Sequence, residues 1–273
     1  SPGEVYAGKT LDYTTDTLPV DISWFDNKRN VFLSESSQFY LELRLLTQNI
    51  DKVFSIYNSF RKEKADFCHL SEFQHIEFEG KVSFDQNIGI FLGLMRHITK
   101  YLIDNERESL EYFIGEEKSK ELMEAFSEGN IVTITFKEAL EALHKETGDD
   151  TYKEFSLKNF GAWEEIRLTE IFGKHVIVTE FPLLQIPFYH NELTKDEDGV
   201  ALAENADFIL CGYRETVGSG TRISSPEALR EKAKAFNLPR EDYDPYIQTR
   251  LHGEYQKTSG FGLGWQRYVQ WVL

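Results

Sequence analysis

Apolar side chains recur at two spacings along the chain, and each spacing predicts a different kind of element. Residues 53–57 and 75–79 alternate between apolar and polar side chains, so we predict two antiparallel strands joined by a charged loop over 62–71. Helical spacing predicts helices over 39–47, 85–103, 136–144 and 226–236, and from Trp265 onward. Short apolar or glycine-rich runs predict strands at 31–34, 175–179, 208–211 and 260–264.

These elements do not alternate regularly as strand and helix, and long loops separate the strands. We therefore predict an α+β fold, an antiparallel sheet flanked by helices, rather than a doubly wound α/β fold. Residues 104–130 are charged and helical, with only Leu110, Phe113 and Leu122 as a potential core stripe. We expect one domain over 1–273, with this segment as a peripheral helical insertion.

Composition narrows the possible functions. Hydrophobic residues make up 41% of the 273 residues, so a sizeable core can form, but no window is apolar enough to span a membrane. Acidic residues outnumber basic ones 46 to 30, and a net charge of −16 argues against a generic nucleic-acid binder. Cys68 and Cys211 form no CxxC pair, so we expect a reducing, cytoplasmic environment.

Three arginines stand beside predicted strands or glycines. Arg61 follows the first strand of the predicted pair, and Arg267 begins the last helix. Arg222 closes the run Gly218-Ser219-Gly220-Thr221-Arg222, which we interpret as a flexible turn. A guanidinium pairs naturally with a phosphate or carboxylate through two parallel hydrogen bonds. The alternative is that each is a surface arginine paired with one of the abundant acids.

Two pairs of acids are candidates for binding cations. Asp207 and Glu215 bracket a predicted strand and its turn, where hard oxygen ligands suit Mg²⁺ held against a polyphosphate. Glu77 and Glu79 lie two residues apart, so they share one face of their strand. That face either binds a cation, an ammonium group or an arginine, or it is exposed to solvent.

Glycines at every second position of Gly260-Phe261-Gly262-Leu263-Gly264 leave one face of a strand bare. A flat ring such as adenine can approach such a strip, although a helix packed on the glycines is the alternative. The sequence has no HExxH, GxSxG or P-loop motif, which argues against the enzyme classes that carry them.

Several segments resemble the class II aminoacyl-tRNA synthetases, aspartyl/asparaginyl branch. The stretch from Phe60 to Glu63, with His69 to Phe73 and Ile76 to Glu79, resembles motif 2 of that family. Gly260 to Arg267 looks like motif 3. Residues 32–42 are similar to the amino-acid-binding segment of the asparaginyl branch, and 218–222 to its Gly-Gly-Ser-x-Arg turn. The order and spacing hold from about residue 32 to the end of the chain.

The resemblance implies an ATP-dependent ligase that forms an aminoacyl-adenylate. Arg61 would hold the α-phosphate, Arg267 the γ-phosphate, and Glu63 the adenine amino group, with Phe73 stacked on the ring. Gly264 would line the same nucleotide site. Asp207 and Glu215 would hold Mg²⁺. Ser36, Gln38, Glu77 and Arg222 would bind the amino acid. Arg222 would recognise its side chain, and Gln38 and Glu77 would fix its amino end.

The chain also departs from the family pattern. The family usually has an arginine where this chain has Cys68, and His69 would replace one phosphate contact there. Leu41 stands where the aspartyl branch has a lysine for the substrate carboxylate, which favours an uncharged amide. Trp163 stands where the family tends to place an acid, although Glu165 is present. We expect no anticodon-binding domain.

Three hypotheses follow. The leading one is activation of asparagine or aspartate by ATP, with tRNA as acceptor, although the charge of the chain disfavours tRNA. The second is an ammonia-dependent asparagine synthetase paralogue. The third is a binding or regulatory module whose catalysis is impaired by the loss of the arginine at position 68. The family resemblance further implies a homodimer.

Overall fold

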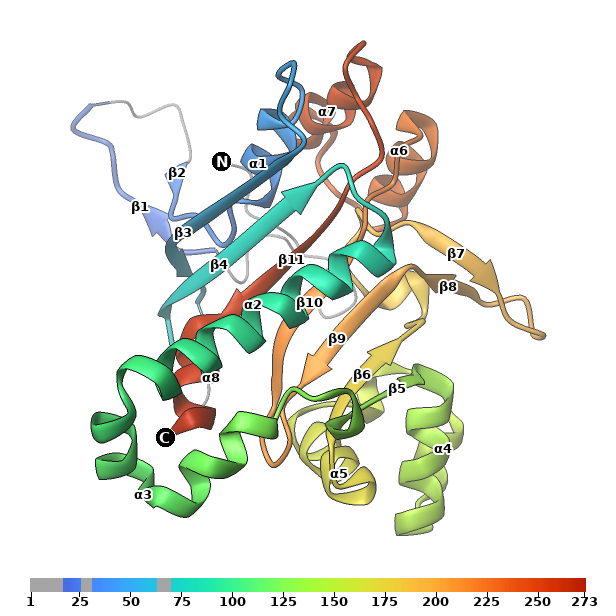
Figure 1. Cartoon of the computed structure of the whole chain (residues 1–273). Coiled ribbons are helices and arrows are strands. Elements are labelled where there is room, and N and C mark those ends of the chain that lie inside the picture. Colours follow the sequence, from blue (N-terminus) through green and yellow to red (C-terminus); the bar gives the residue numbers. More distant parts are fainter. Residues whose placement is uncertain (1–16, 26–30, 63–69) are drawn as a thin grey trace.

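A seven-stranded sheet forms the centre of the computed structural model, which describes residues 17–25, 31–62 and 70–273 (Figure 1). In spatial order the strands are β3 (Lys52–Phe60), β4 (Glu72–Gly80), β11 (Ser259–Gly264), β10 (Glu215–Thr221), β9 (Asn205–Ile209), β6 (His175–Thr179) and β5 (Ile131–Thr135). All neighbours are antiparallel except β5 and β6. The predicted fold class is confirmed, with one parallel pair that the sequence did not indicate.

Helix α2 (Phe84–Asn105) runs across one face of this sheet (Figure 1). Ser83 Oγ accepts a hydrogen bond from the backbone N–H of Gln86, and Gln86 Oε1 accepts one from the backbone N–H of Ser83, so Ser83 caps the first turn. Phe91 and Met95 are fully buried, and Phe78 of β4 packs against their cluster. The apolar side of β4 therefore faces α2, which leaves its polar side facing away.

The segment predicted as a peripheral insertion contains α3 (Arg107–Glu124), which packs against α2 and is kinked at Gly115. Leu110 and Leu122 are buried in the main core, as their spacing predicts. Phe113 is 68% exposed, so its predicted place in the core stripe is wrong. Whether the segment is an insertion stays a prediction.

Two further cores lie at the ends of the sheet. Helices α4 (Phe136–Thr147) and α5 (Ala162–Phe172) pack beside β5 and β6. Helices α1 (Gln38–Arg44), α6 (Pro226–Ala235) and α7 (Arg240–Gln248) gather at the opposite end, where Phe39 stacks on Tyr246. The remaining elements are α8 (Trp265–Val272), the pairs β1 (Pro19–Val20) with β2 (Val31–Phe32) and β7 (Glu192–Lys195) with β8 (Ala201–Ala203), and the 3₁₀ turns Glu128–Asn130, Asp150–Lys153, Leu157–Asn159, Leu183–Gln185 and Thr249–Leu251.

Most predicted elements appear near their expected bounds, but the turn predicted over 218–222 is wrong. Gly218 to Thr221 lie inside β10, and Arg222 follows it directly. The prediction failed because these glycines leave space for neighbouring side chains and do not mark a bend in the backbone. The strands β5 and β10 and the helices α5 and α7 were not predicted.

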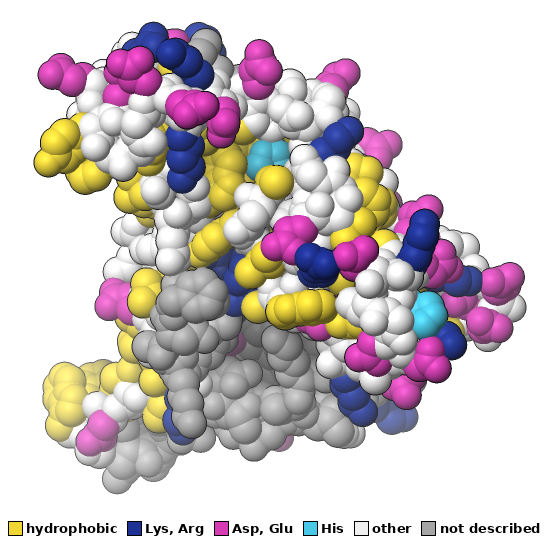
Figure 2. Space-filling view, turned by 90° about the horizontal axis from the view of Figure 1, so that it is seen from below, with side chains coloured by type: hydrophobic (Ala, Val, Ile, Leu, Met, Phe, Trp, Pro, Cys, Tyr) yellow, Lys and Arg dark blue, Asp and Glu magenta, His cyan; other side chains and the backbone are white. Residues whose placement is uncertain are grey.

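The surface carries charges of both signs. In the view from below, Asp and Glu side chains spread over the molecule with Lys and Arg side chains among them (Figure 2). In the part of the chain that the structure describes, no helix is both long and apolar enough to cross a membrane.

Candidate active site

A cavity of about 1020 Å³ lies against β4, β11, β10 and β9. Along these strands the side chains alternate, so that Phe261 and Leu263 of β11 point into the core shared with α2. Glu77, Gly262 and Asp207 point to the other face and line the cavity. The cavity is therefore formed on the polar face of the middle of the sheet.

Gly218 and Gly262 line this cavity, and a second pair of glycines lies next to them on the same two strands. Gly218 lies opposite Gly262, and Gly220 lies opposite Gly260, on the neighbouring strands β10 and β11. A Cβ atom at Gly220 would lie 2.5 Å from His190 Nδ1, and one at Gly218 would lie 2.9 Å from Glu215 Oε1. At Gly260 it would collide with the Glu79 carboxylate. Each of these glycines thus makes room for one polar side chain.

Gly262 differs from the other three glycines. A Cβ there would meet nothing closer than Glu77 Cγ at 3.7 Å. The strip that the sequence predicts as bare is therefore covered by Glu79 at Gly260 and is open at Gly262. A flat ligand can approach the backbone of β11 at that point.

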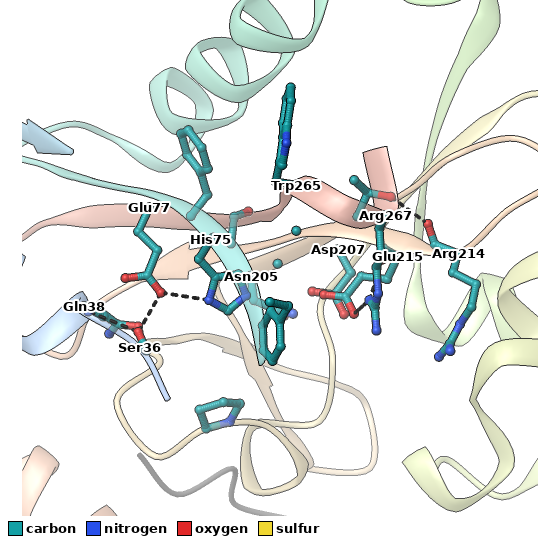
Figure 3. Close-up of a pocket in the computed structure, with 18 of the residues that line it drawn as sticks. Ser36, Gln38, His75, Glu77, Asn205, Asp207, Arg214, Glu215, Trp265 and Arg267 are labelled. Atoms are coloured by element: carbon teal, nitrogen blue, oxygen red, sulfur yellow. Dashed lines mark hydrogen bonds and ion pairs between the residues drawn. The ribbon is translucent and has the colours of Figure 1, made fainter. Parts of the chain in front are cut away.

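Glu77 is held by several hydrogen bonds at one end of the cavity. Ser36 Oγ donates to its Oε1 at 2.6 Å, and the backbone N–H of Ser37 donates to its Oε2 at 2.9 Å. Ser37 Oγ and the Tyr57 hydroxyl donate as well. Figure 3 shows Ser36, Gln38 and Glu77 grouped together. This network fixes a carboxylate at the wall of the cavity, beside the start of α1.

Arg222 and Glu79 form a buried ion pair nearby. Arg222 Nη2 donates to Glu79 Oε2 at 2.9 Å, and its Nε also donates to this carboxylate. Glu42 Oε1 lies 3.9 Å from Arg222 Nε, and Arg250 donates to Glu42 Oε2 at 2.7 Å. Two acids and two arginines therefore balance each other in a buried cluster. Burial raises the pKa of Glu79, and the charge of Arg222 opposes this shift.

Acids predominate at the opposite end of the cavity. Asp207, Glu215 and Glu165 are close enough to affect one another, and burial followed by the charges of Glu215 and Glu165 raises the pKa of Asp207 well above its usual range. Arg267 Nη1 donates to the carbonyl oxygen of Glu215 at 2.6 Å and lies 3.4 Å from its carboxylate. Arg214 Nε donates to Glu165 at 3.3 Å. Figure 3 shows Asp207, Glu215, Arg214 and Arg267 gathered on this side.

Arg61 and His75 lie along the cavity wall contributed by β3 and β4. The guanidinium carbon of Arg61 lies 5.3 Å from the centre of the Phe73 ring, a cation–π distance. His75 Nδ1 lies 2.8 Å from Ser59 Oγ and 3.5 Å from Glu77 Oε1. Burial, with the charges of Arg61 and Arg267, lowers the pKa of His75 to about 3, so its imidazole is neutral near pH 7.

The predicted site residues that the structure describes all line this one cavity: Ser36, Gln38, Arg61, Phe73, Glu77, Asp207, Glu215, Arg222, Gly264 and Arg267. Glu63, His69 and Cys68 lie outside the described residues. The structure thus brings the three arginines to one cavity. The role predicted for each residue stays a prediction.

Several lining residues were not predicted as site residues, among them Glu165, His190 and Arg214. Glu79 was predicted to share a strand face with Glu77, and one expected partner of that face was an arginine, which is Arg222 in the structure. Arg214 precedes Glu215, but no pattern marks it. His190 comes from a segment outside the sheet, and nothing in its sequence neighbours indicates a site.

Comparison with known proteins gives a consistent result. A family model described as "tRNA synthetases class II (D, K and N)" matches residues 12–273. The asparagine–tRNA ligases of two Thermus thermophilus strains are each 30% identical over 271 residues, covering 96% of this chain and 58% of the relative. This chain therefore spans less than two thirds of the length of these relatives.

Solved structures share the fold. The asparaginyl-tRNA synthetase from Pyrococcus horikoshii complexed with asparaginyl-adenylate superposes with a TM-score of 0.79 at 25% identity, covering 98% of this chain and 58% of that one. The enzyme from Entamoeba histolytica in complex with asparaginyl-adenylate gives 0.78 at 22% identity, covering 94% and 56%. The similarity extends over nearly the whole of this chain.

Proposed function

Because this chain belongs to the class II tRNA synthetases of the D, K and N group, we propose that it activates asparagine with ATP. The carboxylate of asparagine would attack the α-phosphorus, forming asparaginyl-adenylate and releasing pyrophosphate. The observation that carries this proposal is that Arg61, Arg222 and Arg267 line one cavity in an otherwise acidic protein. The asparagine–tRNA ligases among its relatives support the choice of amino acid.

The Arg222–Glu79 pair supports an amide side chain in particular. Its guanidinium donates hydrogen bonds and its carboxylate accepts them, and a primary amide offers an oxygen and an N–H₂ group in return. The carboxylate of aspartate would instead face Glu79 and the nearby Glu42, both buried. Arg222 is already neutralised by these acids, so it offers little net charge to a second anion. We therefore propose asparagine rather than aspartate.

The α-amino group of the substrate would bind next to Glu77. This carboxylate is fixed by Ser36, Ser37 and Tyr57, and it is 6% exposed. Its fixed position would orient an ammonium group without a conformational change. Gln38, whose Nε2 donates to Glu42 at 3.0 Å, would contact the amino end from the first turn of α1.

The nucleotide would bind along β4 and β11. Arg61 would stabilise the negative charge that grows on the α-phosphate during attack, and Arg267 would hold the γ-phosphate. The adenine would stack on Phe73 near Gly264, with Glu63 at its amino group and His69 at a phosphate. The open backbone at Gly262 supports a flat ligand on this part of the sheet.

Asp207 and Glu215 have the chemistry that a magnesium site needs. A Cβ at Gly218 would lie 2.9 Å from Glu215 Oε1 and 3.9 Å from Asp207 Oδ1, so both carboxylates approach the same point. Among the described residues no group of three or more His, Cys, Asp or Glu side chains could hold a metal ion. Two carboxylates together with phosphate oxygens are a common magnesium environment. When bound, the ion would neutralise charge on the phosphates of ATP.

We further propose tRNA as the acyl acceptor, in line with the names of the relatives, and a cytoplasmic homodimer. Support for self-association comes from β3, an edge strand on which Phe54 is 72% and Ile56 is 63% exposed. The single domain over 1–273 and the insertion at 104–130 remain part of this proposal.

The test is amino-acid-dependent exchange of labelled pyrophosphate into ATP, measured with asparagine and with aspartate. We expect exchange with asparagine, and at least tenfold weaker exchange with aspartate. If neither asparagine nor aspartate supports exchange, the proposal is contradicted and a binding module is favoured. AMP release that requires ammonia and aspartate would favour an asparagine synthetase, whereas charging of tRNA with asparagine would support the proposed acceptor.

A further inference from the structure

His190 lies where the cavity meets Arg222. It follows Tyr189 in the segment between the 3₁₀ turn at Leu183–Gln185 and β7, and its backbone forms an antiparallel bridge with Arg222. Its side chain lines the cavity, and the residue is only 7% exposed. The imidazole is therefore part of the wall next to the proposed amide-binding group.

Gly220 provides the space for this ring. A Cβ at position 220 would lie 2.5 Å from Nδ1 and 2.6 Å from Cε1 of His190. Contacts this short do not occur, so a side chain at position 220 would displace the imidazole toward the cavity. The same Cβ would lie 3.0 Å from the carbonyl oxygen of Glu204, which belongs to the backbone and has little room to move. Position 220 therefore limits where the imidazole ring can lie at the cavity wall.

Two neighbours fix the other sides of His190. Lys232 of α6 is buried, and its Nζ donates to the carbonyl oxygens of His190 at 3.1 Å and Pro187 at 3.3 Å. The Tyr189 ring stacks on the imidazole with 5.1 Å between centroids, and it lies 5.2 Å from the guanidinium carbon of Arg222. His190 and Arg222 are therefore held as parts of one packed unit.

Hydrogen bonding at the imidazole Nδ1 does not explain this burial. This nitrogen is buried and has no partner among the residues that the structure describes. Burial, and then the charges of Arg222 and Lys232, keep the pKa of His190 well below its usual range, so the ring is neutral. A buried ring with an unpartnered polar atom is an unusual choice for mere packing. A neutral wall beside Arg222 also adds no charge that would attract a carboxylate.

We infer that His190, seated on Gly220, determines substrate specificity by closing the side-chain end of the cavity to amides longer than that of asparagine. This inference rests on the proposed function. Glutamine carries the same amide group one methylene further out, so the Arg222–Glu79 pair alone does not distinguish it from asparagine. The ring limits the depth at which the amide can bind. A pocket that excludes one methylene discriminates by roughly 10- to 200-fold.

The test is pyrophosphate exchange by the full chain with asparagine and with glutamine, comparing kcat/KM for His190→Ala and the wild type. We expect kcat/KM of the wild type to be about 100-fold higher with asparagine than with glutamine. In the variant this preference should be at least tenfold smaller. The change should appear in the KM for the amino acids, while the KM for ATP stays the same. The matched control is His97→Ala, an exposed histidine on α2, which should keep the wild-type ratio.

A second pair of variants tests whether Gly220 positions the imidazole of His190. Gly220→Ala should push the ring into the cavity and raise the KM for asparagine at least tenfold. The double variant Gly220→Ala/His190→Ala should regain part of this loss, because the ring is no longer there to be displaced. If His190→Ala does not fold, judged by circular dichroism, His190→Asn takes its place with the same criterion.

The outcomes separate the two proposals. The wild type could catalyse pyrophosphate exchange with asparagine while every folded His190 variant keeps the wild-type preference for asparagine over glutamine. That result would overturn the inference about His190 and leave the proposed function standing. If the double variant has the same KM for asparagine as Gly220→Ala, the claim that Gly220 positions the His190 ring is overturned. If the wild type exchanges with neither amide, the proposed function fails, and the inference fails with it.

Discussion

The two ends of the cavity are built on opposite electrostatic plans. At the end proposed for the amino acid, Arg222 and Glu79 pair directly, and Glu42 and Arg250 complete a buried cluster with two acids and two arginines. At the end proposed for the phosphates, the acids Asp207, Glu165 and Glu215 lie among the arginines Arg214 and Arg267, and burial with mutual repulsion raises the pKa of Asp207. Figure 3 shows Asp207, Glu215, Arg214 and Arg267 on one side of His75 and Asn205, with Ser36, Gln38 and Glu77 on the other.

This difference shows how each end would select its ligand. A neutral, fully paired cluster favours an uncharged amide, because a ligand can share its hydrogen bonds without adding charge. An acidic cluster with unbalanced charge favours a divalent cation, and the cation brings polyphosphate with it. Substitutions at the two ends should therefore have opposite effects on stability and different effects on activity.

The largest expected effect is at Arg267. Arg267→Ala should lower pyrophosphate exchange by about 10³-fold, since removal of one group that stabilises the transition state costs about 10²- to 10³-fold and the substrate phosphate also loses its anchor. Arg267→Lys keeps the charge without the planar fork and should recover only part of the rate. Normal exchange by Arg267→Ala would refute the role proposed for this residue.

Removal of one partner of the buried ion pair should have the next largest effect. Glu79→Gln leaves the charge of Arg222 facing only Glu42, so we expect the free energy of unfolding in urea to fall by about 3 kcal/mol. Glu215→Gln is the matched control at the phosphate end, and it should leave stability unchanged or raise it, because it relieves repulsion with Asp207. Equal destabilisation by both variants would contradict the contrast between the two ends.

His75, which lies between the ends, should make stability depend on pH. Burial, Arg61 and Arg267 lower its pKa to about 3 in the folded protein, against 6.5 for an ordinary histidine. Between these values the unfolded chain binds a proton that the folded protein does not, so the contribution is full above pH 6.5 and is lost as the pH falls toward 3. At pH 4.5 the free energy of unfolding of the wild type should have dropped by about 2 kcal/mol more, relative to pH 7, than that of His75→Asn.

The smallest expected effect concerns magnesium. Asp207→Asn should raise the Mg²⁺ concentration needed for half-maximal exchange by about tenfold, because one of two carboxylate ligands is lost. The KM for asparagine, which we propose binds at the other end, should not change. A magnesium titration of exchange measures both quantities, and an unchanged magnesium requirement would remove Asp207 from the proposed site.

Local patterns predicted much of the sheet and little of its lining. The alternation in 53–57 and 75–79 predicted the β3–β4 pair, because one face of these strands must be buried. The glycines of β10 were misinterpreted as a turn. They are needed because the fold brings the side chains of His190 and Glu215 close to the backbone of β10. Likewise, the pairing of Arg222 with Glu79 joins residues 143 positions apart, which no local spacing indicates.

The family resemblance brought candidate residues together before the structure did, and the cavity contains all of those that are described. The resemblance did not predict the charge state or the bonding partners of each side chain. The neutral His75, the paired Arg222 and the crowded Asp207 follow from burial and from neighbours contributed by several strands. Such neighbours depend on the three-dimensional register of the sheet rather than on any short motif.

The central claim is that the two ends of the cavity bind the two halves of one ligand. Isothermal titration with a non-hydrolysable sulfamoyl analogue of asparaginyl-adenylate tests it most directly. We predict that the analogue binds at least about 100-fold more tightly than AMP or asparagine alone, and that both Arg222→Met and Arg61→Ala lose most of this advantage. Binding no tighter than that of AMP, or an advantage that survives both substitutions, would contradict the claim.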